Sequence, residues 1–133
     1  AAGAGRDRAV SVARELAEKD EGLVIVYEIP ADADRSALLS ALDAVRARHP
    51  QAAIMLISGQ EIENKVSIVS SVPPALIERG LKAGDWVREV SLVVGGKGGG
   101  RPDAAQGGGT EARKTGEAVA AAQKFAKGKL GIS

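Results

Sequence analysis

The sequence predicts an α/β fold in which a mixed β-sheet is flanked by helices within a single globular domain. Apolar, β-branched-rich runs alternate with segments of helical period along the chain. The order strand, helix, strand favours a parallel pair, whereas two later runs joined by a short polar connection favour an antiparallel hairpin. With 133 residues, 44% of them hydrophobic, the chain is long enough to bury a core as one domain. We expect helices and sheet to form three layers at most.

The N-terminal half predicts two helices around one strand. Residues 6–19 place apolar residues at helical spacing, which indicates an amphipathic helix with one side free for a partner. The run at 23–29 is rich in β-branched residues and ends at Pro30, as expected for a buried strand. Aspartates open the next helical pattern, 34–49, and Pro50 follows it, so a second helix is expected there.

The remaining elements follow from the same patterns. Apolar runs at 52–58 and 65–71 predict the two strands of the hairpin. A short helical turn is expected at 75–81, after two prolines. Valines on one side of 85–94 and an alanine-rich stripe along 114–130 predict two further helices.

Residues 95–109 hold eight of the 17 glycines, together with Lys97 and Arg101. We interpret this segment as a functional loop, because glycine lets another backbone approach closely and exposed amides beside a lysine suit a phosphate. Pro102 restricts Arg101 to an extended conformation and so presents its side chain. A flexible linker is the alternative interpretation. The spacing fits neither a Walker-type phosphate loop nor a dinucleotide fingerprint.

Charge is unevenly distributed along the chain. Residues 1–78 carry eight cations and twelve carboxylates, whereas residues 79–133 carry ten cations and five carboxylates. This asymmetry indicates an anionic partner for the C-terminal part. One Phe, one Tyr and one Trp are too few for a platform that stacks successive bases, and recognition of backbone and shape stays open.

The residues offer little for catalysis. The chain has no cysteine, and its one histidine, His49, precedes a proline at a predicted helix end, where a capping role is expected. No spacing typical of metal ligands occurs, and no base lies near the strand serines. No apolar run is long enough to cross a bilayer. We expect no catalytic residue, no metal site and no membrane contact, and we expect Trp86 to be buried with its N–H bonded.

Two motifs carry a resemblance to a known family. Gly-Leu-Lys-Ala-Gly-Asp-Trp-Val at 80–87 and the glycine-rich run at 95–109 resemble the C-terminal domain of alanyl-tRNA synthetases, in the DHH-associated superfamily. The resemblance covers about residues 22–130. The phosphoesterases of that superfamily end their glycine run with histidine, where this chain has Arg101, and their aspartate-histidine-histidine motif is missing. The resemblance therefore disfavours a nuclease.

The resemblance implies that residues 1–21 are the end of a helical linker and that residues 22–133 are a globular tRNA-binding domain. Such a domain recognises tRNA by shape and phosphate, helps couple aminoacylation with editing, and carries no ligase chemistry itself. ATP, zinc and magnesium would belong to other parts of a longer cytoplasmic alanine–tRNA ligase, with no cofactor here. The residues expected to contact RNA or brace its site are Lys82, Lys97, Gly98, Gly99, Gly100, Arg101, Asp103, Gln106, Gly107 and Gly108.

Two other functions stay open at this point. The apolar side of the helix at 6–19 could mediate dimerisation, with the charge asymmetry incidental. The same basic surface could bind DNA, since phosphate recognition separates the two polymers poorly.

Overall fold

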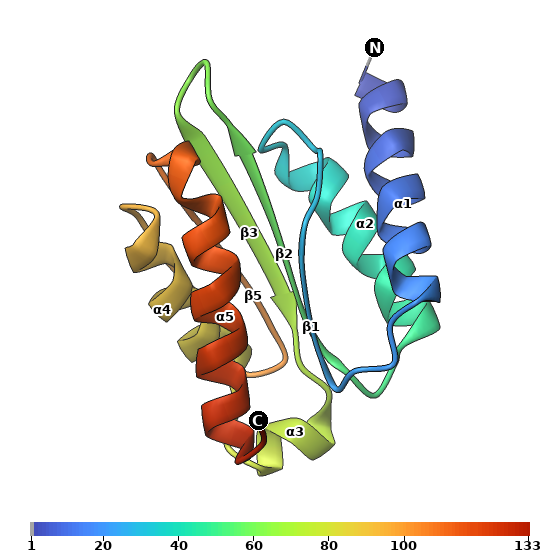
Figure 1. The fold of residues 1–133 in the computed structure, drawn as a ribbon, viewed down its shortest axis with the longest axis vertical. Helices are drawn as coiled ribbons and strands as arrows, with labels where there is room; N and C mark the ends of the chain where they lie inside the picture. The colour runs from blue at the N-terminus through green and yellow to red at the C-terminus, as the bar shows by residue number, and fades with distance from the viewer. Residues whose placement is uncertain (1) are drawn as a thin grey trace.

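Five strands form one mixed sheet at the centre of the computed structural model, which describes residues 2–133 (Figure 1). The strand order is β1-β2-β3-β5-β4, with β1 and β2 parallel and the other neighbours antiparallel. The predicted fold class and the predicted hairpin of β2 and β3 are confirmed. The strands are β1 (Val24–Glu28), β2 (Ala53–Gln60), β3 (Lys65–Ser71), β4 (Lys97–Gly100) and β5 (Ala104–Gly109).

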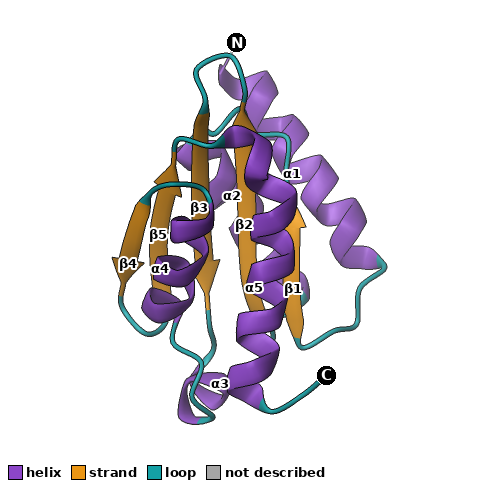
Figure 2. Cartoon of the chain, turned by 60° about the vertical axis from the view of Figure 1, so that its left-hand side comes forward, coloured by secondary structure: helices purple, strands orange, loops and turns teal. Residues whose placement is uncertain are grey.

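Helices cover both faces of this sheet, which gives three layers (Figures 1 and 2). On one face α1 packs on α2, and α2 packs on β2 and β3. On the other face α5 covers β1 and β2, while α4 covers β3, β4 and β5. The helices are α1 (Ala2–Glu18), α2 (Arg35–Arg48), α3 (Pro74–Glu78), α4 (Ala83–Val93) and α5 (Thr115–Leu130), with a short 3-10 turn, η1 (Ala112–Lys114), before α5.

Local chemistry fixes the ends of α2. The Asp34 side chain accepts hydrogen bonds from the amides of Ser36 and Ala37, so it caps the helix start. His49 is the C-cap, as the sequence predicted, and its backbone N–H donates to the Val45 carbonyl. Its Nε2 also donates to the Ala17 carbonyl at 2.6 Å, at the end of α1. The bond from His49 Nε2 to Ala17 joins the end of α2 to the end of α1.

Each face of the sheet has its own apolar core. Ile25, Leu56 and Val69 face α2, whereas Met55 and Ile68 face α4 and α5. Trp86 of α4 is fully buried in the second core, and its Nε1 donates to the Ala122 carbonyl of α5 at 2.9 Å. The expectation of a buried, bonded tryptophan is confirmed. Its hydrogen bond ties α4 to α5 across the layer.

The prediction of a loop at 95–109 is wrong. The glycines form the antiparallel hairpin of β4 and β5, which extends the sheet by two strands. Glycine is needed here because α4 lies directly on the hairpin: a Cβ at Gly98 would come within 2.5 Å of Val87 Cγ1, and one at Gly107 within 2.4 Å of Ser91 Oγ. Without side chains, the hairpin lets the helix approach its backbone.

Several boundaries also differ from the sequence prediction. The first helix begins at Ala2, not at residue 6, so most of the expected N-terminal linker is helical, and Ala1 lies outside the described residues. Most of its apolar side is covered within the domain, because Ala9, Ala13 and Ala17 are buried against α2, whereas Leu16 is 39% exposed. Dimerisation through this helix stays a prediction, with less free apolar surface than the sequence indicated. Over the described residues, no helix has the length and apolar character needed to span a membrane.

Candidate nucleic-acid interface

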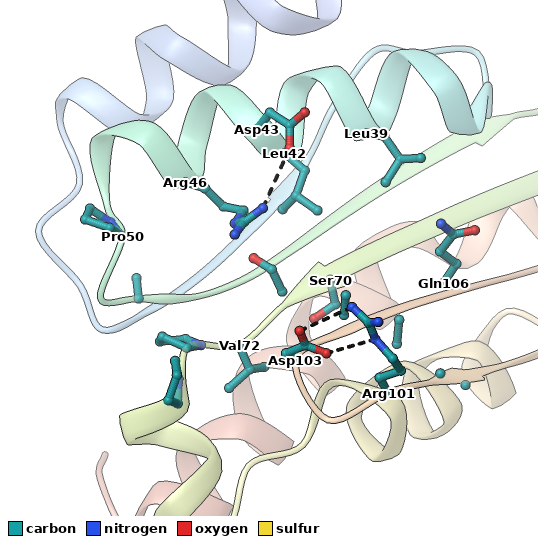
Figure 3. A pocket seen from close by; sticks show the side chains of 18 of the residues that line it. Leu39, Leu42, Asp43, Arg46, Pro50, Ser70, Val72, Arg101, Asp103 and Gln106 are labelled. Carbon is teal, nitrogen blue, oxygen red and sulfur yellow. Dashed lines mark hydrogen bonds and ion pairs between the residues drawn. The ribbon is translucent and has the colours of Figure 1, made fainter.

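A groove of about 840 Å³ lies between α2 and the β4–β5 hairpin (Figure 3). It exists because α2 covers β2 and β3, while small residues of β4 and β5 leave the adjoining part of the same sheet face uncovered. The end of β3 and the segment leading into α3 close its lower part. The lining residues are Arg35, Leu39, Leu42, Asp43, Arg46, Pro50, Ala52, Ser70, Ser71, Val72, Pro73, Pro74, Gly99, Gly100, Arg101, Asp103, Ala104, Ala105 and Gln106.

One wall of the groove is a face of α2. Arg35, Leu39, Leu42 and Arg46 recur at helical spacing along it, with the two arginines at the ends. The Arg46 guanidinium lies 3.8 Å from Asp43 Oδ1, and both side chains are largely exposed. An exposed pair at this distance restrains Arg46 only weakly, so its guanidinium is free to reorient toward an anion.

The opposite wall is the turn between β4 and β5. Arg101 Nε and Nη2 donate to Asp103 Oδ1 and Oδ2 at 3.2 and 3.3 Å. The turn is fixed by its backbone: the amides of Ala83 and Gly84, in the first turn of α4, donate to the carbonyls of Pro102 and Arg101. Arg101 therefore extends from a rigid turn.

The floor of the groove is sheet surface with few side chains. Val69, Gln106 and Gly99 form one cross-strand row that faces the α2 side, and Ser71 and Ala104 form the next. Nothing lies within 4 Å of the position that a Cβ on Gly99 would take. A ligand can therefore approach the backbone of β4 and β5, with the Gln106 side-chain amide as a polar group on this floor.

The structure divides the site residues predicted from the sequence into three groups. Gly99, Gly100, Arg101, Asp103 and Gln106 line the groove. Lys97 and Gly108 are cross-strand partners in a row on the same face, further along the hairpin, where Ser67 is their neighbour in β3. The remaining residues lie elsewhere: Gly98 and Gly107 pack under α4, and Lys82 precedes α4 beside the turn.

The glycine amides of β5 do not form the expected free cradle. Strand β5 lies between β3 and β4 and pairs with both, so its backbone is engaged in the sheet on two sides. A phosphate cannot take the amides of β5 without breaking the sheet. Arginine side chains around the groove, rather than converging amides, are the positive groups that this face offers.

Sequence reasoning missed two of those arginines. Arg35 and Arg46 lie on α2, more than fifty residues before the hairpin turn, and only the folded sheet brings them opposite Arg101. Their spacing on one face of a predicted helix was a signal available in the sequence. The overall negative charge of residues 1–78 obscured it.

The groove does not bring together a set of catalytic groups. Its two carboxylates, Asp43 and Asp103, are each paired with an arginine. The single histidine, His49, does not line it and is bound to the end of α1. Between residues 2 and 133, no cluster of three or more His, Cys, Asp or Glu side chains is arranged to hold a metal ion.

Together, the fold and the groove define a class: a small three-layer α/β domain with an arginine-edged opening on an uncovered part of its sheet. The family follows from comparison with known proteins. Residues 21–128 match the DHHA1 domain, and the chain belongs to this family. The matched range begins after α1, although α1 packs on the rest of the structure.

The relatives agree with this assignment. The chain is 43% identical over 122 residues to the cytoplasmic alanine–tRNA ligase of Drosophila melanogaster, covering 91% of this chain and 13% of that protein. It is 40% identical over 109 residues to the alanine–tRNA ligase of Rhodopirellula baltica, covering 82% of this chain and 11% of that protein. The chain thus spans only a small part of these relatives' length.

A solved structure confirms the fold. The C-Ala domain of Aquifex aeolicus alanyl-tRNA synthetase superposes with a TM-score of 0.63 at 30% identity, and the match covers 84% of this chain and 97% of that domain. The resemblance read from residues 80–109 is therefore confirmed over most of the chain.

Proposed function

We propose that this domain binds tRNA in the groove between α2 and the β4–β5 hairpin, as part of a longer alanine–tRNA ligase. One observation carries the proposal: arginines from two separate elements lie on opposite sides of an uncovered stretch of sheet, as Figure 3 shows for Arg46 and Arg101. Arginine suits this task because its planar guanidinium binds phosphate through paired N–H groups. Membership of a family whose relatives are named alanine–tRNA ligases supplies the partner.

The lining favours contact with RNA backbone over contact with unpaired bases. The groove has three arginines against two aspartates, and no Phe, Tyr or Trp. Structured RNA displays ribose hydroxyls and phosphates on its surface, and proteins that recognise its shape use such contacts. Gln106 adds a donor and an acceptor to the floor, both suited to a 2′-hydroxyl. Lys97, further along the same face, extends the positive surface.

Arg46→Ala tests this assignment. Losing one charged phosphate contact should weaken tRNA binding by about five- to tenfold and lower the slope of log K against log salt by about 0.7 to 0.9. The matched control is Lys124→Ala, which removes one charge from the exposed side of α5, beyond the opposite face of the sheet. Anisotropy titrations with labelled tRNA at several salt concentrations measure both quantities.

If Lys124→Ala weakens binding as much as Arg46→Ala, only overall charge matters and the groove assignment fails. Competition by duplex DNA is the second readout. We expect tRNA to displace labelled tRNA at lower concentration than DNA does, because the proposal is recognition of RNA shape as well as phosphate. Equal competition would favour the DNA-binding alternative.

Family membership supports a wider role, which we propose with it. The domain would hold tRNA for both the aminoacylation and the editing parts of the longer enzyme without performing ligase chemistry itself. ATP, zinc and magnesium would then be bound outside this chain. The Drosophila relative is named as a cytoplasmic enzyme, and this supports a cytoplasmic setting for the longer protein.

A further inference from the structure

The two aspartates of the groove are held in different ways. Asp103 accepts two hydrogen bonds from Arg101, one on each carboxylate oxygen, at 3.2 and 3.3 Å. Asp43 lies 3.8 Å from Arg46 and makes no hydrogen bond to it. Both aspartates would repel a phosphate by charge alone. Only Asp103 also sets the orientation of an arginine.

The pairing leaves the other edge of the guanidinium available. A carboxylate that engages Nε and Nη2 occupies one side of the group, so Nη1 and its two N–H donors face away from Asp103. Figure 3 shows Asp103 on one side of the Arg101 side chain, within the groove. The free N–H groups therefore have a defined direction before any ligand arrives.

The backbone around this pair is fixed as well. The Asp103 carbonyl accepts the amide of Val72, and the Arg101 amide donates to the Ala104 carbonyl. A Cβ at Gly84 would come within 2.7 Å of the Gly100 carbonyl oxygen, so the start of α4 packs directly on the hairpin beside the turn. Both partners of the ion pair thus extend from one rigid platform.

We propose that Asp103 is a positioning residue for RNA: it pre-orients Arg101 for phosphate, and replacing it by Asn weakens binding although this removes a negative charge from the groove. This proposal rests on the proposed function. A long arginine side chain loses rotamer freedom when it binds a ligand, and this loss of entropy weakens binding. A guanidinium that is already fixed has lost part of that freedom beforehand, so binding costs it less. The repulsion of phosphate by Asp103 is small in comparison, because Arg101 already offsets its charge and both side chains are exposed to solvent.

Asp103→Asn and Asp43→Asn form a matched pair for the test, since each removes one negative charge from the same groove. We expect Asp103→Asn to weaken tRNA binding by about three- to tenfold. Asp43→Asn should tighten binding slightly, because it removes a negative charge beside Arg46 and breaks no hydrogen bond to an arginine. If Asp103→Asn tightens binding as a simple charge removal would, the proposal is overturned.

A double-mutant cycle with Arg101→Ala shows whether Asp103 acts through Arg101. In the Arg101→Ala background, Asp103→Asn should no longer weaken binding. An equal loss in both backgrounds would overturn the proposal, because Asp103 would then act through something else. Wild-type protein that fails to bind tRNA would refute the proposed function itself. If the wild-type domain binds tRNA but the effect of Asp103→Asn does not depend on Arg101, only the role of Asp103 is refuted.

A second measurement needs no RNA. Nitrogen relaxation at Arg101 Nε should report an ordered side chain in the wild-type domain and a mobile one in Asp103→Asn. If the Arg101 side chain is equally ordered in the wild-type domain and in Asp103→Asn, Asp103 does not pre-orient Arg101. Unchanged thermal midpoints are expected for both aspartate variants, since exposed ion pairs add little to stability.

Discussion

At the scale of single residues, Tyr27 shows how one hydrogen bond fixes the connection between α1 and β1. Its hydroxyl donates to Asp20 Oδ2 at 2.8 Å, and Asp20 Oδ1 accepts the Gly22 amide at 2.8 Å. Burial of the ring, and then the hydrogen bond and charge of Asp20, raise the pKa of Tyr27 well above its ordinary value. The neutral hydroxyl is therefore the form that the folded chain favours.

This shift predicts a loss of stability in strong alkali. Folding raises the pKa of Tyr27 above its unfolded value of 10.0. The neutral hydroxyl therefore contributes fully to the free energy of unfolding below pH 10, and this contribution falls as the pH rises above 10. The chain has one tyrosine, so tyrosinate absorbance follows this group alone. We expect the folded protein to titrate above pH 10, and the urea-unfolded protein to titrate near the ordinary value.

Asp20→Asn is the control for the cause of this shift. Removing the charge should lower the folded pKa of Tyr27 only in part, because burial is the larger cause. A folded wild-type tyrosine that titrates at its ordinary pKa would contradict the structure around Asp20.

At the scale of elements, the contact between α4 and the glycine hairpin makes a sharp prediction. Gly107→Ala should destabilise the fold by about 1 to 3 kcal/mol, because its Cβ would overlap Ser91 Oγ and Val87 Cγ1. Gly99→Ala is the matched control on the neighbouring strand, where a Cβ meets open space, and it should change stability by less than about 0.5 kcal/mol. Urea unfolding followed by circular dichroism measures both, and equal effects would contradict this packing.

The β4–β5 hairpin also shows what could not be predicted from the sequence. Its position in the chain was recognised, and Arg101 and Gln106, named from the sequence, line the groove, but its strand structure was not predicted. Glycine disfavours strands, so local patterns indicated a loop. The edge of β3 and the close approach of α4 supply the stabilisation that glycine lacks, and both come from elements distant in sequence.

Elements with strong local signals were predicted well. The helix at 34–49 has an aspartate cap and a following proline, and α2 occupies 35–48 within those limits. The groove that α2 borders was not predictable from the same signals. Its depth depends on how far α2 extends across the sheet, and this is set by tertiary packing.

At the scale of the whole molecule, the two faces of the sheet are covered unequally. Together α4 and α5 contact all five strands on one face, whereas α2 on the other face lies over β2 and β3. The uncovered part beside α2 is the groove whose side chains Figure 3 shows. An open sheet face edged by arginines is the feature from which the RNA-binding proposal follows.

The most direct test of that proposal is chemical-shift mapping of backbone amides during a tRNA titration of the whole 133-residue chain. We expect the largest changes at groove residues from both walls and the floor, with Arg46, Gly99 and Gln106 as reporters, and little change at Lys124 on α5. Changes concentrated on α5, with the groove unaffected, would contradict the account.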